Sequence, residues 1–138
     1  MALPEDVGPW PKEQMPDDSR LYMNVHKSHI DPNDGELMVG VFRDHDGGMS
    51  TDWNKYSTAE QTRGRAATPS NNGVIHLPVS GMRLIEGLSV EHDPVCKKFR
   101  AANGRWIQPN RAHTEVFGEK NEQRRLRLSR IFQWEIRL

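Results

Sequence analysis

The sequence predicts a single compact α+β domain with a mostly antiparallel sheet, one short helix and one longer C-terminal helix. Its 138 residues match the length of one domain. Segments typical of strands and of helices follow one another without regular βαβ alternation, and the chain contains no internal repeat. Residues 1–19 are rich in proline and acidic residues, which disfavour helices and central strands. We therefore expect a flexible tail over residues 1–19 and one domain over residues 20–138.

Strand-like patterns account for most of the predicted domain. Apolar and polar side chains alternate over residues 21–25, as in a half-buried strand. Residues 37–42 form a short apolar run that is typical of a buried strand. Pro78 restricts a strand over residues 74–79 to a sheet edge, or else ends it. Two further strands are predicted over residues 112–117 and 134–138.

Two helices are predicted from capping and spacing. Residues 57–60 have the pattern of a capping box with Ser57 or Thr58 at the N-cap, and Gly64 ends the short helix that they open. Residues 119–133 predict the longer helix, because apolar residues recur at helical spacing on one face. Residues 96–109 are basic and contain glycine, which indicates a long exposed loop or an insertion.

The net charge of zero conceals an asymmetry between the two halves. Residues 1–60 hold 5 basic and 12 acidic residues, a net charge of −7. Residues 61–138 hold 14 basic and 7 acidic residues, a net charge of +7. Opposite charges attract, so the acidic half is expected to pack against the basic half of the same chain. Self-association through the two halves, or two differently charged partners, remain the alternatives.

The composition excludes several classes of protein. No run approaches the roughly 18 apolar residues of a membrane span, so no membrane partner is expected. One cysteine, Cys96, excludes an intramolecular disulfide and a cysteine-based zinc site. The first 16 residues contain no apolar segment of a signal peptide. We therefore expect a cytoplasmic protein.

Basic residues of the second half give the strongest signal for a partner. Cations attract phosphates and acidic proteins, and a loop tryptophan between them can stack on a base. Pairing with the acidic first half is the alternative explanation. The predicted binding residues are Lys97, Lys98, Arg100, Arg105, Trp106, Arg111, Arg124, Arg125, Arg127 and Arg130.

A second group of residues has the types needed for catalysis. His92 and Asp93 lie where an apolar block ends, and Asn110 and His113 follow later in the chain. The order His, Asn, His resembles that of a His-Asn-His nuclease, in which the first histidine activates water. His113 and Glu115 would share one face of a strand and could hold one divalent metal. The simpler alternative is that Asp93 or Asn110 caps a turn and that both histidines belong to a polar surface.

Three short motifs carry a resemblance to a group of proteins. The motifs are Met49-Ser-Thr-Asp-Trp53, Leu88-Ser-Val-Glu-His-Asp-Pro94 and Asn110-Arg-Ala-His113, with the basic helix after them. Together they resemble a pattern in small bacterial proteins of no assigned activity. The resemblance implies a bacterial, cytoplasmic origin and transfers no catalytic residue.

These observations predict a non-catalytic interaction module or accessory subunit of a bacterial assembly. Its basic half would bind an acidic protein or a nucleic acid, without a cofactor. The alternative is a small metal-assisted nuclease or hydrolase, with His92 as general base and Asn110, His113 and Glu115 as orienting or metal-binding groups. The sequence alone does not decide whether the protein is an enzyme.

Overall fold

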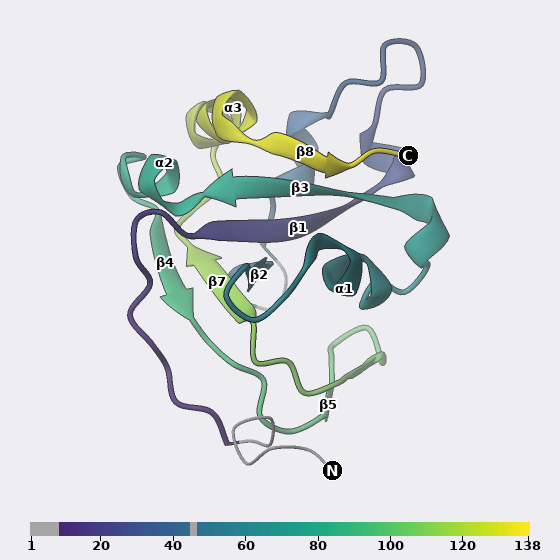
Figure 1. Cartoon of the computed structure of the whole chain (residues 1–138). Coiled ribbons are helices and arrows are strands. Elements are labelled where there is room, and N and C mark those ends of the chain that lie inside the picture. The colour runs from purple at the N-terminus through teal and green to yellow at the C-terminus, as the bar shows by residue number, and fades with distance from the viewer. Residues whose placement is uncertain (1–8, 45–46) are drawn as a thin grey trace.

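Six antiparallel strands form the central sheet of the computed structural model, which describes residues 9–44 and 47–138 (Figure 1). The strand order is β4-β7-β2-β1-β3-β8. Two further strands, β5 and β6, pair with each other alone. The bounds in chain order are β1 Arg20–His26, β2 Met49–Trp53, β3 Asn72–Pro78, β4 Ser89–His92, β5 Phe99–Arg100, β6 Trp106–Ile107, β7 His113–Phe117 and β8 Gln133–Ile136.

Three α-helices and three short 3-10 helices complete the fold, which confirms the predicted α+β class with its longer C-terminal helix. Thr58, one of the two predicted N-caps, caps α1 with Gln61 as the reciprocal partner. The α2 helix was not predicted from the sequence. The bounds are α1 Ala59–Gly64, α2 Val79–Arg83, α3 Glu122–Ile131, η2 Lys27–His29, η3 Val39–Val41 and η4 Pro69–Asn71.

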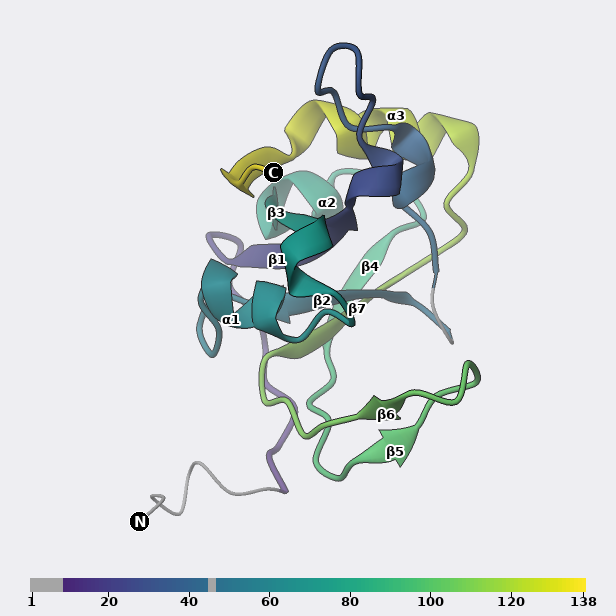
Figure 2. The ribbon, with the colours of Figure 1, turned by 90° about the vertical axis from the view of Figure 1, so that its right-hand side faces the viewer.

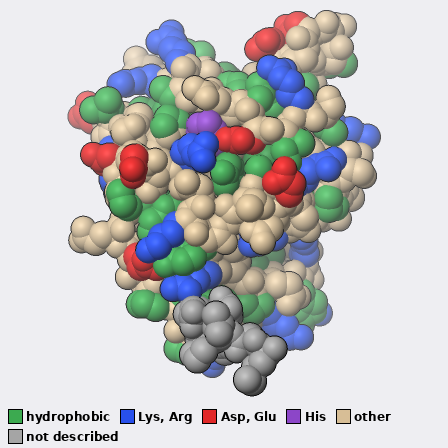
Figure 3. Space-filling view, viewed as in Figure 1, with side chains coloured by type: hydrophobic (Ala, Val, Ile, Leu, Met, Phe, Trp, Pro, Cys, Tyr) green, Lys and Arg blue, Asp and Glu red, His purple; other side chains and the backbone are tan. Residues whose placement is uncertain are grey.

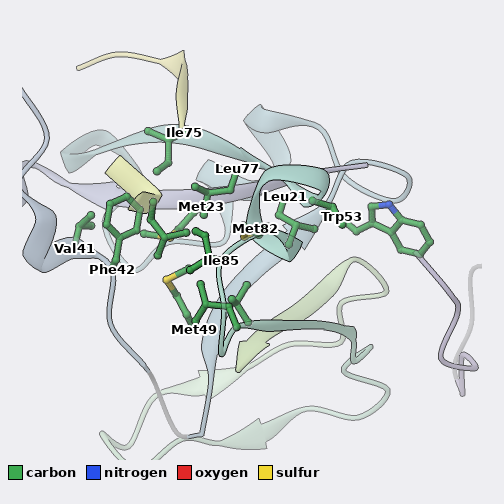
Figure 4. Close-up of a cluster of buried hydrophobic side chains, with 14 of the residues drawn as sticks. Leu21, Met23, Val41, Phe42, Met49, Trp53, Ile75, Leu77, Met82 and Ile85 are labelled. Carbon is green, nitrogen blue, oxygen red and sulfur yellow. The ribbon is translucent and has the colours of Figure 1, made fainter. Parts of the chain in front are cut away.

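The strand period of two gives the sheet two different faces. On one face, side chains of β1, β2 and β3 meet α2, α3 and η3 in the main core, part of which Figure 4 shows. On the other face, α1 covers a small cluster in which Tyr22 and Val74 contact Ala59. Ser50, Asp52, His113 and Glu115 lie on this second face. We call it the polar face.

The run at residues 37–42 does not form the predicted strand. Leu37 alone makes a bridge, to Ile30, and the chain then turns into η3. Val41 and Phe42 are neighbours in sequence, and both are buried in the main core. A strand would direct them to opposite faces, and the turn allows both to reach the same core.

The predicted strand at residues 74–79 lies inside the sheet, between β1 and β8. Pro78 is the last residue of β3 and pairs with Arg20, so the proline ends the strand without placing it at an edge. The C-terminal segment covers the free side of β3 as β8, in agreement with the strand predicted over residues 134–138. The preceding helix is shorter than predicted, because Asn121 caps its start.

The folded part begins before residue 20. Met15 is buried in the main core. The backbone N–H of Glu13 donates to Nδ1 of His92 at 3.0 Å, and that of Trp10 donates to Sγ of Cys96 at 3.3 Å. Residues 9–19 therefore pack on the domain, whereas residues 1–8 of the predicted tail lie outside the described residues.

Ion pairs connect the acidic and the basic half, as the charge asymmetry predicts. Four pairs within the described residues join a carboxylate of the first half to a cation of the second. Basic and acidic side chains are interspersed on the face shown in Figure 3. No helix in the described part of the chain is long and apolar enough to cross a membrane. The four pairs are Asp17–Arg83, Asp44–Lys120, Glu13–Arg111 and Asp52–Arg65.

Candidate functional site

A cleft of about 570 Å³ opens between the polar face and the β5–β6 hairpin. Figure 2 shows the hairpin as a separate ribbon beyond β2 and β7. Residues of β1, β2 and β7 line the cleft on one side, and residues 105–110 line it on the other. Its lining holds three arginines and one carboxylate, Asp52, which is itself paired with Arg65. The excess of cations favours an anionic ligand.

A buried network around Asp52 supports the floor of the cleft. Its Oδ2 accepts hydrogen bonds from Thr62 Oγ1 at 2.8 Å and from Arg65 at 2.7 Å. Its Oδ1 accepts from Nδ2 of Asn110 at 2.8 Å. Because these donors come from α1 and from the segment before β7, the carboxylate holds both elements against β2. Such a fully satisfied buried carboxylate is a structural group rather than a free reagent.

The hairpin presents an aromatic side chain beside cations at the rim of the cleft. Trp106 is 48% exposed and lines the cleft. Lys98 Nζ lies 5.2 Å from the centre of its ring, and the Arg100 guanidinium lies 5.0 Å from it. Arg105 donates a hydrogen bond of 2.6 Å to the backbone carbonyl of Arg65, which connects the hairpin to the end of α1. Lys97 is exposed next to these residues.

The other predicted binding residues do not join this hairpin group. The α3 helix lies at the opposite end of the molecule from β5 and β6 (Figures 1 and 2). Arg124, Arg125 and Arg127 donate hydrogen bonds to backbone carbonyls, which gives them a structural role in holding α3. Arg130 shares that helix. The Arg111 guanidinium lies 4.1 Å from the centre of the Tyr56 ring, toward the N-terminal segment.

His92 does not have the geometry of a general base. It is 2% exposed, and its ring contacts Trp53 and Tyr56. Nδ1 accepts the N–H of Glu13, so Nε2 carries the proton and donates it to the carbonyl of Arg111 at 2.7 Å. Both ring nitrogens are therefore occupied in the neutral form. A general base needs a free nitrogen within reach of a substrate proton.

The predicted site of His92, Asn110 and His113 does not come together. His92 pairs with Thr114 across β4 and β7, so its side chain lies on the same face as that of Thr114. His113 precedes Thr114 and points to the other face of the sheet. Asn110 donates to Asp52 and accepts from the N–H of Ala112, which leaves it no orienting role.

A different set of residues comes together on the polar face. Asp93, His113 and Glu115 each offer a ligand atom, and the three atoms lie within 4.8 Å of one another. Nδ1 of His113 donates to the carbonyl of Asp93 at 2.8 Å, and Nε2 lies 3.4 Å from Oε1 of Glu115. His113 and Glu115 alternate on β7, as predicted from the sequence, and Asp93 follows β4. We call these three residues the triad.

The electrostatics of the triad depend on Glu115. This residue is 9% exposed, and burial raises the pKa of its carboxyl. A charge on His113 acts in the opposite direction, and a charge on Asp93 acts in the same direction as burial. The carboxylate would be more stable as an anion if a cation lay beside it.

Several residues of the cleft were not predicted from the sequence. Asp52, Ser50 and Tyr22 lie on strands whose neighbours in the sheet are distant in sequence. The alternation Met49, Thr51, Trp53 was the available signal for β2, because it places Ser50 and Asp52 on the opposite face.

Comparisons of this chain with protein-family models, with curated proteins and with solved structures found no match.

Proposed function

We propose that the protein is a binding module for single-stranded nucleic acid, which it holds in the cleft beside the β5–β6 hairpin. One observation carries the proposal: Trp106 lies half-exposed at the rim of the cleft, and the cations of Lys98 and Arg100 lie over its ring. An aromatic face with nearby cations matches one nucleotide unit, because the base stacks and the phosphate pairs with the cation. In a larger assembly, such a module would serve as an accessory subunit.

A single strand fits the cleft better than a duplex or an acidic protein. The stacking faces of bases are free in a single strand and are hidden in a duplex. The lining of the cleft adds the hydroxyl of Ser50, which can form a hydrogen bond with the edge of a base. An acidic protein would need the cations but would gain little from the indole of Trp106.

Fluorescence anisotropy with labelled single-stranded RNA, single-stranded DNA, duplex DNA and poly-glutamate tests this proposal over a salt series. We expect both single strands to bind more tightly than the duplex, and affinity to fall as salt rises. Trp106→Ala should weaken binding by about 1–3 kcal/mol, because one stacking interaction is lost. Trp106→Phe should retain most of the affinity.

A charge-matched pair of variants locates the binding surface. Lys98→Ala combined with Arg100→Ala removes two hairpin cations and should make the salt dependence shallower by about 1.4 in the slope of log K against log salt. Arg127→Ala combined with Arg130→Ala removes two cations at the opposite end and should leave the slope unchanged. Equal effects of the two pairs, or binding of poly-glutamate alone, would contradict the proposal.

The surroundings of His92 do not fit a nuclease. Its general base is hydrogen-bonded on both nitrogens, and its two histidines face opposite sides of the sheet. The triad retains the predicted metal-binding pair of His113 and Glu115.

A further inference from the structure

We infer that Asp93, His113 and Glu115 form a binding site for one divalent transition-metal cation at the β4–β7 side of the cleft. The inference does not depend on nucleic-acid binding, because it rests on three ligand atoms of the polar face and not on the hairpin. His113 belongs to both places, since it lines the cleft and is a member of the triad. A bound cation would therefore lie next to the ligand of the cleft.

The hydrogen bond of His113 prepares its ring for a metal. The carbonyl of Asp93 can only accept, so Nδ1 of His113 carries the proton and Nε2 keeps its lone pair. That lone pair points toward Oε1 of Glu115 at 3.4 Å and toward Oγ of Ser50 at 3.4 Å. A histidine that donates its other N–H to a backbone carbonyl is the usual arrangement at a protein metal site.

Glu115 supplies a buried carboxylate that is only partly compensated inside the protein. Its Oε2 is shielded from solvent and has no hydrogen-bond partner within the described residues. The backbone N–H of Gly48 favours the charged form of the carboxyl, but it does not fully satisfy Oε2. A buried carboxylate oxygen without a partner costs free energy. A cation beside Glu115 would remove this cost.

The spacing of the three ligand atoms suits one cation. Two atoms bound to one metal at about 2.1 Å are at most about 4.2 Å apart. Nε2 of His113 and Oε1 of Glu115 already meet this limit. The side chain of Asp93 is 45% exposed, and its ion pair among the described residues is a long one, of 3.8 Å, with the exposed Lys12. It can rotate closer and exchange that lysine for the metal.

The chemistry of the ligands selects the class of cation. Imidazole nitrogen favours the later first-row metals, whereas carboxylates favour manganese, magnesium and calcium. One nitrogen with two carboxylates therefore fits Mn²⁺ or Zn²⁺ better than Mg²⁺ or Ca²⁺. Three protein ligands also leave a position open for water or for a phosphate of a bound strand.

Titration calorimetry of the metal-free full-length protein with Mn²⁺, Zn²⁺ and Mg²⁺ is the direct measurement. We expect one Mn²⁺ or one Zn²⁺ per chain and much weaker binding of Mg²⁺. Glu115→Gln and Asp93→Asn should each lower the affinity for the metal at least tenfold. Mutating residues that only hydrogen-bond to metal ligands already has effects of about that size, and these two residues would be ligands themselves. Electron paramagnetic resonance of Mn²⁺ provides a second readout of the bound fraction.

Glu91→Gln is the matched control. Glu91 pairs with Glu115 in register on the neighbouring strand but is exposed and lies outside the triad. Its substitution should leave the affinity unchanged. Thermal melting without metal checks folding, and Asp93→Asn keeps the test valid if Glu115→Gln does not fold. Binding that survives both triad substitutions, an equal loss in Glu91→Gln, or no binding of Mn²⁺ and Zn²⁺ at millimolar concentration would overturn the inference.

Discussion

Glu13 fixes the N-terminal segment to the domain through both its side chain and its backbone. Its carboxylate accepts hydrogen bonds from Lys55 Nζ at 2.6 Å and from the hydroxyl of Tyr56, and its N–H donates to His92. Burial alone would raise the pKa of Glu13, but the hydrogen bonds from Lys55 and Tyr56 outweigh it and hold the pKa below its usual value. The charged carboxylate therefore stabilises the folded state.

This lowered pKa predicts a pH-dependent loss in Glu13→Gln. A carboxyl with a lowered pKa contributes stability above its unfolded pKa, and the contribution disappears as pH falls through the folded pKa. We expect the variant to lose about 1 kcal/mol in the free energy of unfolding at pH 7 and much less near pH 3. Urea denaturation over a pH series measures both values. Asp18→Asn, an exposed change in the same segment, is the control, and an equal loss at both pH values would contradict the prediction.

The hydrogen bonds of His92 predict that this residue stabilises the folded state. Its two ring nitrogens bond the N–H of Glu13 and the carbonyl of Arg111, and both backbone groups lose a partner in His92→Ala. We expect a decrease of about 1–3 kcal/mol in the free energy of unfolding, measured by urea denaturation. His26→Ala is the comparison, because His26 bonds only locally to Ser28 at the end of β1 and should change stability by less than about 0.5 kcal/mol. Similar losses in the two variants would show that His92 is not a structural residue.

Among the secondary-structure elements, the β5–β6 hairpin is structurally independent of the six-stranded sheet. The bridge between Val95 and Asn110 closes its base with backbone hydrogen bonds of 2.9 and 2.8 Å. Beyond this bridge, residues 97–106 are mostly exposed, and Phe99 and Trp106 contribute nothing to the main core. The proposed binding site and the main core are therefore located in different elements.

Replacing residues 97–108 with a short Gly-Ser connection tests this separation. We expect the free energy of unfolding to change by less than about 1 kcal/mol, because no buried apolar side chain is lost. Binding of single-stranded nucleic acid should disappear in the anisotropy assay, because Trp106 and its cations are removed. A cooperative melt with unchanged binding would place the nucleic-acid site elsewhere.

Across the whole molecule, ion pairs within one chain neutralise part of the charge asymmetry. Carboxylates of the N-terminal segment reach the second half through Asp17–Arg83 and Glu13–Arg111, and Asp44 reaches Lys120 beside the last helix. Surface pairs of this kind add little stability each. Their main consequence is that fewer unpaired charges remain to attract a second copy.

We therefore expect the protein to remain monomeric at low ionic strength, where attraction between opposite halves would be strongest. Analytical ultracentrifugation at 20 mM and 300 mM salt measures this directly. The comparison variant is Arg83→Glu, which replaces the cation of the internal Asp17–Arg83 ion pair with a carboxylate. A salt-sensitive dimer of the wild-type chain would support the alternative of head-to-tail association.

Local patterns were sufficient for the elements whose signals lie within a few residues. The alternation that starts at Leu21 gave β1, and the cap at Thr58 with the stop at Gly64 gave α1. The strand predicted at residues 37–42 was wrong, because a short apolar run indicates that residues are buried but does not indicate their backbone conformation. The packing of residues 9–19 was also missed, since it depends on contacts with His92 and Cys96, which lie about 80 residues away.

Three features follow from local sequence patterns: the α+β class, the charge asymmetry between the halves, and the common strand face of His113 and Glu115. Which residues meet across neighbouring strands depends on the tertiary fold. The register of β4 on β7 directs His92 away from His113 and brings Asp93 beside it. The physical reason is that strand pairing joins segments about 20 or more residues apart, and a shift of one residue would move every side chain to the other face of the sheet.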